Sequence, residues 1–225
     1  IAAISGLIEY LSTTQKGQLP LLRRPVCEDR DDFVAIDAAT RKNLELTQTL
    51  SGERSGSLLS VVDRSVTSSG ARLLFRRITT PSQRLATIEE RASAVAFFCG
   101  QSGLRGAVRS ALKQLPDVER ALGRVALERS GPRDLLALGS GIIQAAQVHA
   151  LLAQHDLPPL LQNAADDLKG FEALSDELDR ALVSDAPLLA RDGGFVATGY
   201  SSELDEITAL RDEARSFIAR MQADY

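Results

Sequence analysis

The segment LPDVERALGRVALERSGPRDLLAL, Leu115–Leu138, predicts the architecture of this chain. Its first half favours a short helix at Val118–Leu127, just after Pro116. Gly131-Pro132 then places a proline at the first position of a longer helix, where the missing N–H is tolerated. We expect that helix to reach about residue 154, because apolar residues follow at alternating steps of three and four: Leu135, Leu138, Ile142, Ala145 and Leu152. Such a narrow apolar seam is suited to packing against an antiparallel helix.

Helical periodicity recurs on both sides of this segment. Asp37 and Thr67 are the expected N-cap residues of two helices, because an Asp carboxylate or a Thr hydroxyl accepts hydrogen bonds from the first free backbone N–H groups. Pro81 ends the second of these helices, since the residue before a proline disfavours helical backbone. The predicted helices outside the opening segment cover residues 1–15, 38–46, 57–63, 68–78, 85–100, 104–115, 160–168, 171–183 and 202–225.

Two short stretches favour β-structure within this mainly α chain. Phe33–Ile36, FVAI, is apolar and short enough for a strand. Near residues 188–198, two apolar runs flank Asp192-Gly193-Gly194, and glycine adopts the positive φ angles of a tight turn without steric cost. The sequence therefore predicts a small β-hairpin near 188–198.

The composition indicates a globular intracellular protein. The chain has 225 residues, of which 44% are hydrophobic, which is enough to bury the core of one large or two modest domains. Cys27 and Cys99 lie 72 positions apart without metal-ligand spacing, so we expect reduced thiols in the cytoplasm. We expect no membrane span, because no apolar run approaches the ~20 residues that one requires. Met221 is the single methionine, and we expect the chain to be a piece of a longer protein.

Charge is unevenly distributed along the chain. Residues 1–114 contain 16 Lys and Arg against 11 Asp and Glu, a net charge of +5, whereas residues 115–225 contain 10 against 19, a net charge of −9. An acidic surface repels the phosphate backbone of nucleic acids. The second half is therefore a poor candidate for direct DNA contact, and we expect its role to be mechanical.

No catalytic, cofactor-binding or metal-binding residue is expected. A phosphate-binding loop needs a lysine directly after a glycine, and none of the lysines has that context. His149 and His155 are six positions apart, which separates them by about 240° around one helix, so they cannot share a metal ion from one face. No Ser-His-Asp or Cys-His set has a local signature. We interpret Asp117, Glu119, Arg120 and Arg124 as a structural salt-bridge group.

The densest basic stretch runs from Arg64 to Arg84. Within it Arg72, Arg76 and Arg77 are the candidates for contact with phosphate or with an acidic partner, and Arg72 and Arg76 lie one helical turn apart. The alternative is a solvated helix face with internal ion pairs. We favour that alternative, because no aromatic residues are interleaved to stack on bases.

Three motifs in one order carry a family resemblance: DAATRKNLELTQTLSG from Asp37, the opening segment, and RDGGFVATGYSSELDE from Arg191. Together they resemble the core and lever region of the MutS family of DNA mismatch repair ATPases, over nearly the whole chain. Two positions depart from the family pattern, which often has tryptophan at Ile78 and an apolar residue at Ser82. The resemblance implies a multi-helix core at 1–115 and long antiparallel lever helices at 116–225 that lead towards an absent clamp domain.

The resemblance also implies a function. The parent protein is expected to be a homodimeric, DNA-stimulated ATPase that binds mismatched duplex DNA, ATP with Mg²⁺, and a MutL-like protein. This fragment would couple the DNA clamp to the ATPase domain without being an enzyme itself, because the Phe-x-Glu mismatch-reading motif and the phosphate-binding loop lie outside it. Two alternatives stay open: a free-standing helical protein-interaction module that uses the Arg64–Arg84 face, and a MutS paralogue that acts in recombination control.

Overall fold

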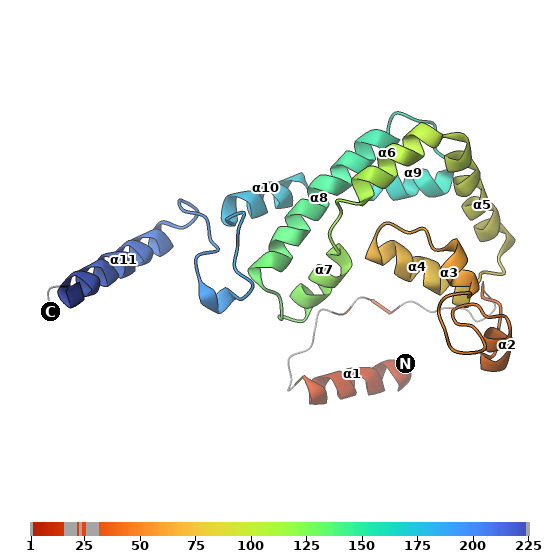
Figure 1. The fold of residues 1–225 in the computed structure, drawn as a ribbon, viewed down its shortest axis with the longest axis horizontal. Helices are drawn as coiled ribbons and strands as arrows, with labels where there is room; N and C mark the ends of the chain where they lie inside the picture. The colour runs from red at the N-terminus through yellow and green to blue at the C-terminus, as the bar shows by residue number, and fades with distance from the viewer. Residues whose placement is uncertain (1, 16–21, 23, 26–31, 224–225) are drawn as a thin grey trace.

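The computed structural model describes residues 2–15, 22, 24–25 and 32–223, and it is mainly helical, as predicted (Figure 1). The elements in chain order are α1 (Ala2–Thr14), α2 (Ala38–Asn43), α3 (Leu58–Val62), α4 (Ser68–Thr79), α5 (Leu85–Gly100), α6 (Ser102–Leu112), α7 (Val118–Ala126), α8 (Pro132–Leu152), α9 (Pro159–Asp166), α10 (Glu172–Ala181), a 3-10 turn (Ala190–Asp192) and α11 (Ser202–Ala223). The two longest helices, α8 and α11, are those that the sequence predicts to be long.

The predicted N-caps are confirmed. The Asp37 carboxylate accepts a hydrogen bond from the Thr40 backbone N–H at 2.6 Å, and α2 begins directly after Asp37. The Thr67 hydroxyl accepts one from the Gly70 N–H at 3.0 Å at the start of α4. Each cap satisfies a backbone donor that the first helical turn leaves free. Local side-chain chemistry therefore determines where these two helices begin.

The predicted strand at 33–36 is wrong. Phe33 forms only an isolated bridge with Ser82, and the Val34 N–H donates to the Pro81 carbonyl at 2.9 Å. Ala35 is no longer part of a β-bridge, so the pairing does not extend into a β-ladder. The apolar FVAI stretch is an extended segment held against the turn between α4 and α5.

The predicted β-hairpin near 188–198 is also wrong, because the described residues contain no β-strand. Ala190–Asp192 forms a 3-10 turn, and the glycine pair after it has φ of +70° at both positions. Residues 195–197 pair instead with residues 181–183 at the end of α10, through an isolated antiparallel bridge. The glycine pair makes the expected turn, but the partner of the following segment lies further back along the chain than local sequence indicates.

Helix α8 is the central element of the fold, and α6, α7, α9 and α10 pack against it. In Figure 1, α6 and α9 lie along one end of α8, and α7 and α10 flank the other. The main hydrophobic cluster lies at the first of these ends, where burial of apolar side chains stabilises the packing by roughly 25 cal/mol per Å². Its buried members are Leu104, Val108, Val148, Leu152 and Ala165.

The close approach of α7 to α8 requires glycine at residue 141, whereas the contact of α10 at Gly139 would leave room for a methyl group. A Cβ on Gly139 would lie 3.6 Å from the Leu178 side chain of α10, and a Cβ on Gly141 would lie 2.3 Å from Val118 Cγ2 of α7. Both glycines are buried. In the predicted seam, Leu152 is buried whereas Leu138 is only partly buried. The closest helix contacts of α8 are therefore made at small residues beside the seam.

The expectation that no segment reaches the length of a membrane span needs correction. In the described part of the chain, α8 is long and apolar enough to cross a membrane, by length and composition alone, with a mean hydropathy of 1.5 in its most apolar window. The core helix of a globular domain meets the same criterion. Four helices pack against α8, and 17% of that window is buried.

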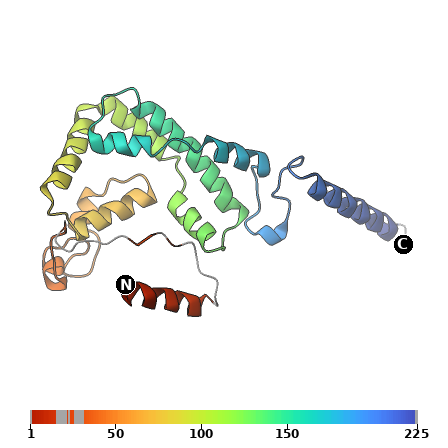
Figure 2. The ribbon, with the colours of Figure 1, turned by 180° about the vertical axis from the view of Figure 1, so that it is seen from behind.

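Helix α11 projects away from the remainder of the molecule, and Figures 1 and 2 agree on this from opposite sides. All its side chains from residue 209 to residue 222 are exposed, among them the large apolar side chains of Leu210 and Phe217. At ~1.5 Å per residue, its 22 residues span about 33 Å. The division of the chain at residue 115 stays a prediction.

Candidate functional site

The most extensive polar contact between helices joins α4 to α7. The Arg72 guanidinium donates to both carboxylate oxygens of Asp117, at 3.0 Å from Nη1 and 2.7 Å from Nη2. It also donates to Glu119 Oε2, at 3.1 Å from Nε and 2.6 Å from Nη2. Bidentate pairs of this kind fix orientation as well as distance. We call this contact the α4–α7 junction.

The α4–α7 junction keeps Asp117 ionised. The hydrogen bonds from Arg72 lower the pKa of Asp117, and the Arg120 backbone N–H, which donates to Asp117 Oδ1 at the start of α7, lowers it further. In return, Asp117 and then Glu119 raise the pKa of Arg72. One carboxylate therefore caps α7 and also holds α4 against it.

A second polar contact, the α7–α8 junction, continues from α7 to α8. Arg124 near the end of α7 donates from Nε to Asp134 Oδ1 at 2.9 Å, and its Nη2 also bonds that oxygen. The other oxygen of Asp134 accepts from the Gly131 backbone N–H at 3.0 Å, which closes the first turn of α8. Arg124 is the main cause of the lowered pKa of Asp134.

The predicted salt-bridge group is confirmed, since Asp117, Glu119, Arg120 and Arg124 all form ion pairs. The sequence interpretation missed the partner on α4, because Arg72 lies 45 residues before Asp117. It also missed Asp134, although a carboxylate three residues after the N-cap position, here Gly131, is typical of a helix-capping residue. The two junctions thus connect α4, α7 and α8 in series.

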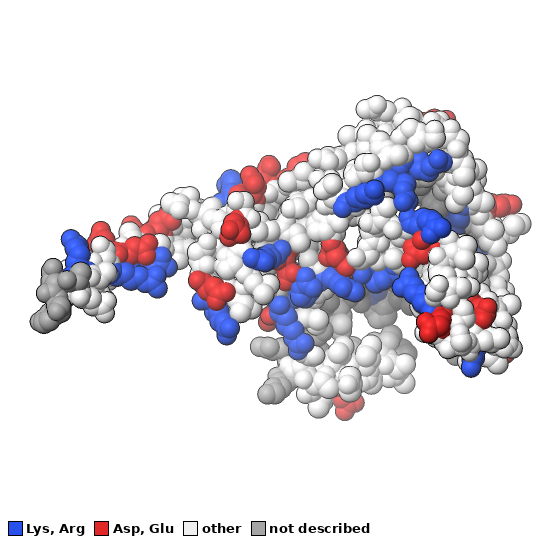
Figure 3. Space-filling view, viewed as in Figure 1, with Lys and Arg blue, Asp and Glu red and all other residues white. Residues whose placement is uncertain are grey.

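The other two candidate arginines lie apart from this network. Arg76 and Arg77 are in the last turn of α4 and exposed, and none of the ion pairs found among the described residues includes them. Partial burial and the positive charges of Arg91 and Arg76 lower the pKa of Arg77. Figure 3 shows basic side chains across α4 and α7, interleaved with acidic ones. Contact of these arginines with phosphate or a partner stays a prediction.

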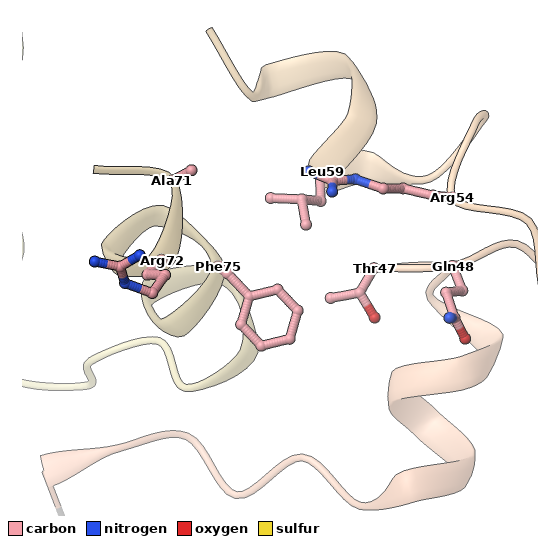
Figure 4. A pocket seen from close by; sticks show the side chains of 7 residues that line it. All are labelled: Thr47, Gln48, Arg54, Leu59, Ala71, Arg72 and Phe75. Atoms are coloured by element: carbon pink, nitrogen blue, oxygen red, sulfur yellow. The ribbon is translucent and has the colours of Figure 1, made fainter. Parts of the chain in front are cut away.

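A cavity of about 500 Å³ opens beside Arg72 (Figure 4). Phe75 and Leu59 point into it from α4 and α3, with Thr47 opposite, and Arg54 lies at its rim. No acid, histidine or cysteine lines it. It therefore lacks the paired base and nucleophile that covalent catalysis requires.

The histidines have structural contacts. His149 Nδ1 lies 2.9 Å from the Ala165 carbonyl of α9, and the His155 ring packs edge-on against Phe97 at 6.5 Å between centroids. Among the described residues, no group of three His, Cys, Asp or Glu could hold a metal ion. Cys99 is free and exposed, while Cys27 lies outside the described residues.

Comparison with known proteins identifies relatives over the full chain. The family model described as MutS domain III matches residues 39–223. The DNA mismatch repair protein MutS of Roseobacter denitrificans is 53% identical over 225 residues, that of Paracoccus denitrificans 55%, and that of Ruegeria pomeroyi 54%. Each match covers 100% of this chain but 26% of the relative, so the chain spans about a quarter of their length.

Proposed function

The chain belongs to the MutS domain III family, and we propose that it acts as the core and lever region of a mismatch repair protein. In that role it couples a DNA-gripping clamp to an ATPase domain. The observation that supports this most directly is the contrast between the packed body around α8 and the projecting, uncovered α11. A rod of about 33 Å attached to a rigid body is suited to carrying a displacement along its axis.

The two junctions supply the rigid part of this proposal. Arg72 fixes α4 to the start of α7, and Arg124 fixes the end of α7 to the start of α8. A shift imposed on α4 would therefore move α7 and α8 with it. Coupling between distant sites requires such an element with two arrangements that both ligands bias.

The remaining parts of the parent's activity would come from outside this chain. We propose that the parent binds mismatched duplex DNA, a MutL-like protein, and ATP with Mg²⁺, as a cytoplasmic homodimer. None of the lysines in this chain follows a glycine in a phosphate-binding loop, so its own residues would hold neither nucleotide nor metal. We therefore infer that the fragment is not an enzyme.

Two alternatives have less support. DNA mismatch repair proteins are 50–55% identical to this chain, which favours mismatch repair over a paralogue in recombination control. A free-standing interaction module would use the Arg64–Arg84 face, but Arg72, within that face, pairs with Asp117 and Glu119. We retain Arg76 and Arg77 as contacts for phosphate or an acidic partner.

An insertion in α11 tests the proposal. Insertion of Gly-Gly after Ala214, in a full-length protein that contains this chain, costs ~2 kcal/mol of helix propensity and interrupts the rod. We expect near-normal basal ATP hydrolysis and a reduced stimulation by mismatched DNA. The matched control is Gly-Gly inserted after Gly52, in the exposed loop between α2 and α3, which should leave the stimulation intact. Full stimulation with a demonstrably broken helix would contradict the proposal.

A further inference from the structure

The orientation of α11 depends on the connector that precedes it, residues 183–201. The side chains of α11 from residue 209 to residue 222 are exposed, and none of the major helix-to-helix packing contacts includes α11. Whatever holds the connector therefore also determines where α11 points. The connector is fixed at three places: by α10 backbone, by the start of α8, and by side-chain hydrogen bonds at the base of α11, where Tyr200 bonds Glu177 and the Gly199 N–H bonds Asp205.

The first attachment is made by backbone hydrogen bonds, and the second is made by close packing against the start of α8. The Val183 N–H donates to the Phe195 carbonyl at 3.0 Å, and the Ala197 N–H donates to the Ala181 carbonyl at 2.9 Å. The first bond closes the intervening loop on itself, and the second fastens its far end to the last residue of α10. Residues 198–201 form the last part of the connector before α11 begins.

The intervening loop also rests against the start of α8. Arg133 Nε donates to the Ala186 carbonyl at 3.0 Å, and Ala186 is buried. A Cβ on Gly131 would lie 2.5 Å from the Leu188 carbonyl oxygen, so only glycine permits this approach. The α8 helix, which the α7–α8 junction holds, is thus in direct contact with the connector.

The third attachment lies two residues before α11. The Tyr200 hydroxyl donates to Glu177 Oε1 of α10 at 2.6 Å, and Arg180 pairs with the other oxygen of the same carboxylate. Tyr200 is 46% exposed, so the bond does not depend on a buried ring. Gly199, beside it, has φ of +88°, and its N–H donates to Asp205 Oδ2 of α11 at 2.8 Å, so this residue is itself tied to the first turn of α11.

We infer that residues 183–201 form a joint in which the Tyr200–Glu177 hydrogen bond holds α11 in one orientation relative to α8 and α10. With the bond intact, α11 extends the rigid body. With the bond broken, the side-chain link from the base of α11 to α10 is lost, and α11 can reorient about residues 198–201 while the Phe195–Val183 and Ala197–Ala181 bonds keep the connector attached. The consequence for signalling rests on the proposed function, but the joint itself is a property of this chain.

Distance measurements between spin labels on the 225-residue chain test the joint. Cys27 and Cys99 are replaced with serine, and labels are attached at Gln147→Cys on α8 and Arg215→Cys on α11, both exposed positions. Tyr200→Phe removes only the hydroxyl. We expect it to widen the distribution of α8–α11 distances at least twofold, with an unchanged circular dichroism spectrum.

Two further variants test whether a wider distance distribution is specific to loss of the Tyr200 hydroxyl. Tyr10→Phe removes the hydroxyl of a more exposed tyrosine on α1 and should leave the distribution as narrow as in the parent chain. Arg180→Gln removes the ion pair on Glu177 but not the tyrosine bond, and should also leave it narrow. A distribution unchanged by Tyr200→Phe, or widened equally by Arg180→Gln, would overturn the assignment. If Tyr200→Phe does not fold, Glu177→Ala breaks the same bond from α10.

The experiment separates this inference from the proposed function. It uses neither DNA nor nucleotide, so a negative result removes the joint and leaves the coupling role of α11 to be judged by the Gly-Gly insertion. Conversely, a widened distribution supports the joint even if the insertion after Ala214 has no effect on ATP hydrolysis.

Discussion

At the scale of single residues, the glycines of α8 show how sequence features that look unfavourable can be required by packing. Glycine in a helix interior lowers stability by roughly 0.5–1 kcal/mol relative to alanine. Gly141 is nevertheless buried against Val118 of α7, and an added Cβ would overlap with a β-branched side chain that has little rotamer freedom. The cost of the glycine is therefore offset by the close approach of α7.

Alanine substitution at two helical glycines should have opposite effects. Gly141→Ala should destabilise the chain by about 1–3 kcal/mol, because the new methyl group overpacks the α7–α8 contact. Gly106→Ala in α6, where no atom lies within 4 Å of the added Cβ, should stabilise it by roughly 0.5–1 kcal/mol. Urea unfolding measures both. Val118→Ala should relieve the Gly141→Ala defect, and two effects that simply add would contradict a direct contact.

The residue scale also shows which parts of the fold local sequence can predict. Asp37 and Thr67 were predictable as caps, because an N-cap acts on the backbone two or three residues ahead. The partners of Arg72 were not, because they lie on another helix 45 residues away. Paired interior glycines at 139 and 141 were the available signal for a close helix contact on α8.

At the scale of elements, the helices were predictable from the periodic spacing of apolar residues. The short extended segments were not predictable from their apolar composition. Both predicted β-elements were apolar runs next to turn residues, but strand formation requires a partner with several aligned backbone groups. Residues 195–197 find such groups only at 181–183, and Phe33 only at Ser82. The candidate site was predictable in part: its α7 members were identified as a salt-bridge group, and its α4 and α8 members were not.

The α4–α7 junction should make stability sensitive to acid. The folded-state pKa of Asp117 is lowered, mainly by Arg72, so its stabilising effect is present above the unfolded pKa of about 3.9 and is lost as pH falls through the folded value. Arg72→Gln should lower Tm at pH 7, and the Tm difference from the parent chain should shrink below about pH 4. Thermal unfolding between pH 7 and pH 2.5 measures this.

A matched substitution controls for loss of positive charge. Arg109 is exposed on α6, and no ion pair among the described residues includes it. Arg109→Gln should change Tm far less than Arg72→Gln and should not alter the acid dependence. A Tm difference for Arg72→Gln that stays constant from pH 7 to pH 2.5 would mean that Asp117 is not its partner in solution.

At the scale of the whole molecule, a packed body, two polar junctions and a projecting rod are joined in series. The body is organised around α8, and the connector transfers the position of α8 and α10 to α11. Each contact in the series has fixed geometry. We therefore expect a ligand at one end of the parent to change the orientation of α11 relative to α8 without unfolding either helix.

The most direct test measures that orientation in a full-length protein that contains this chain. Spin labels at Gln147→Cys and Arg215→Cys report the α8–α11 distance with matched duplex, with mismatched duplex, and with mismatched duplex plus ATP. We expect a distinct distance distribution with mismatched duplex and a further change when ATP is added. Tyr200→Phe should reduce the differences between the three distributions. One distribution shared by all three states would contradict the claim that this region couples DNA binding to the nucleotide.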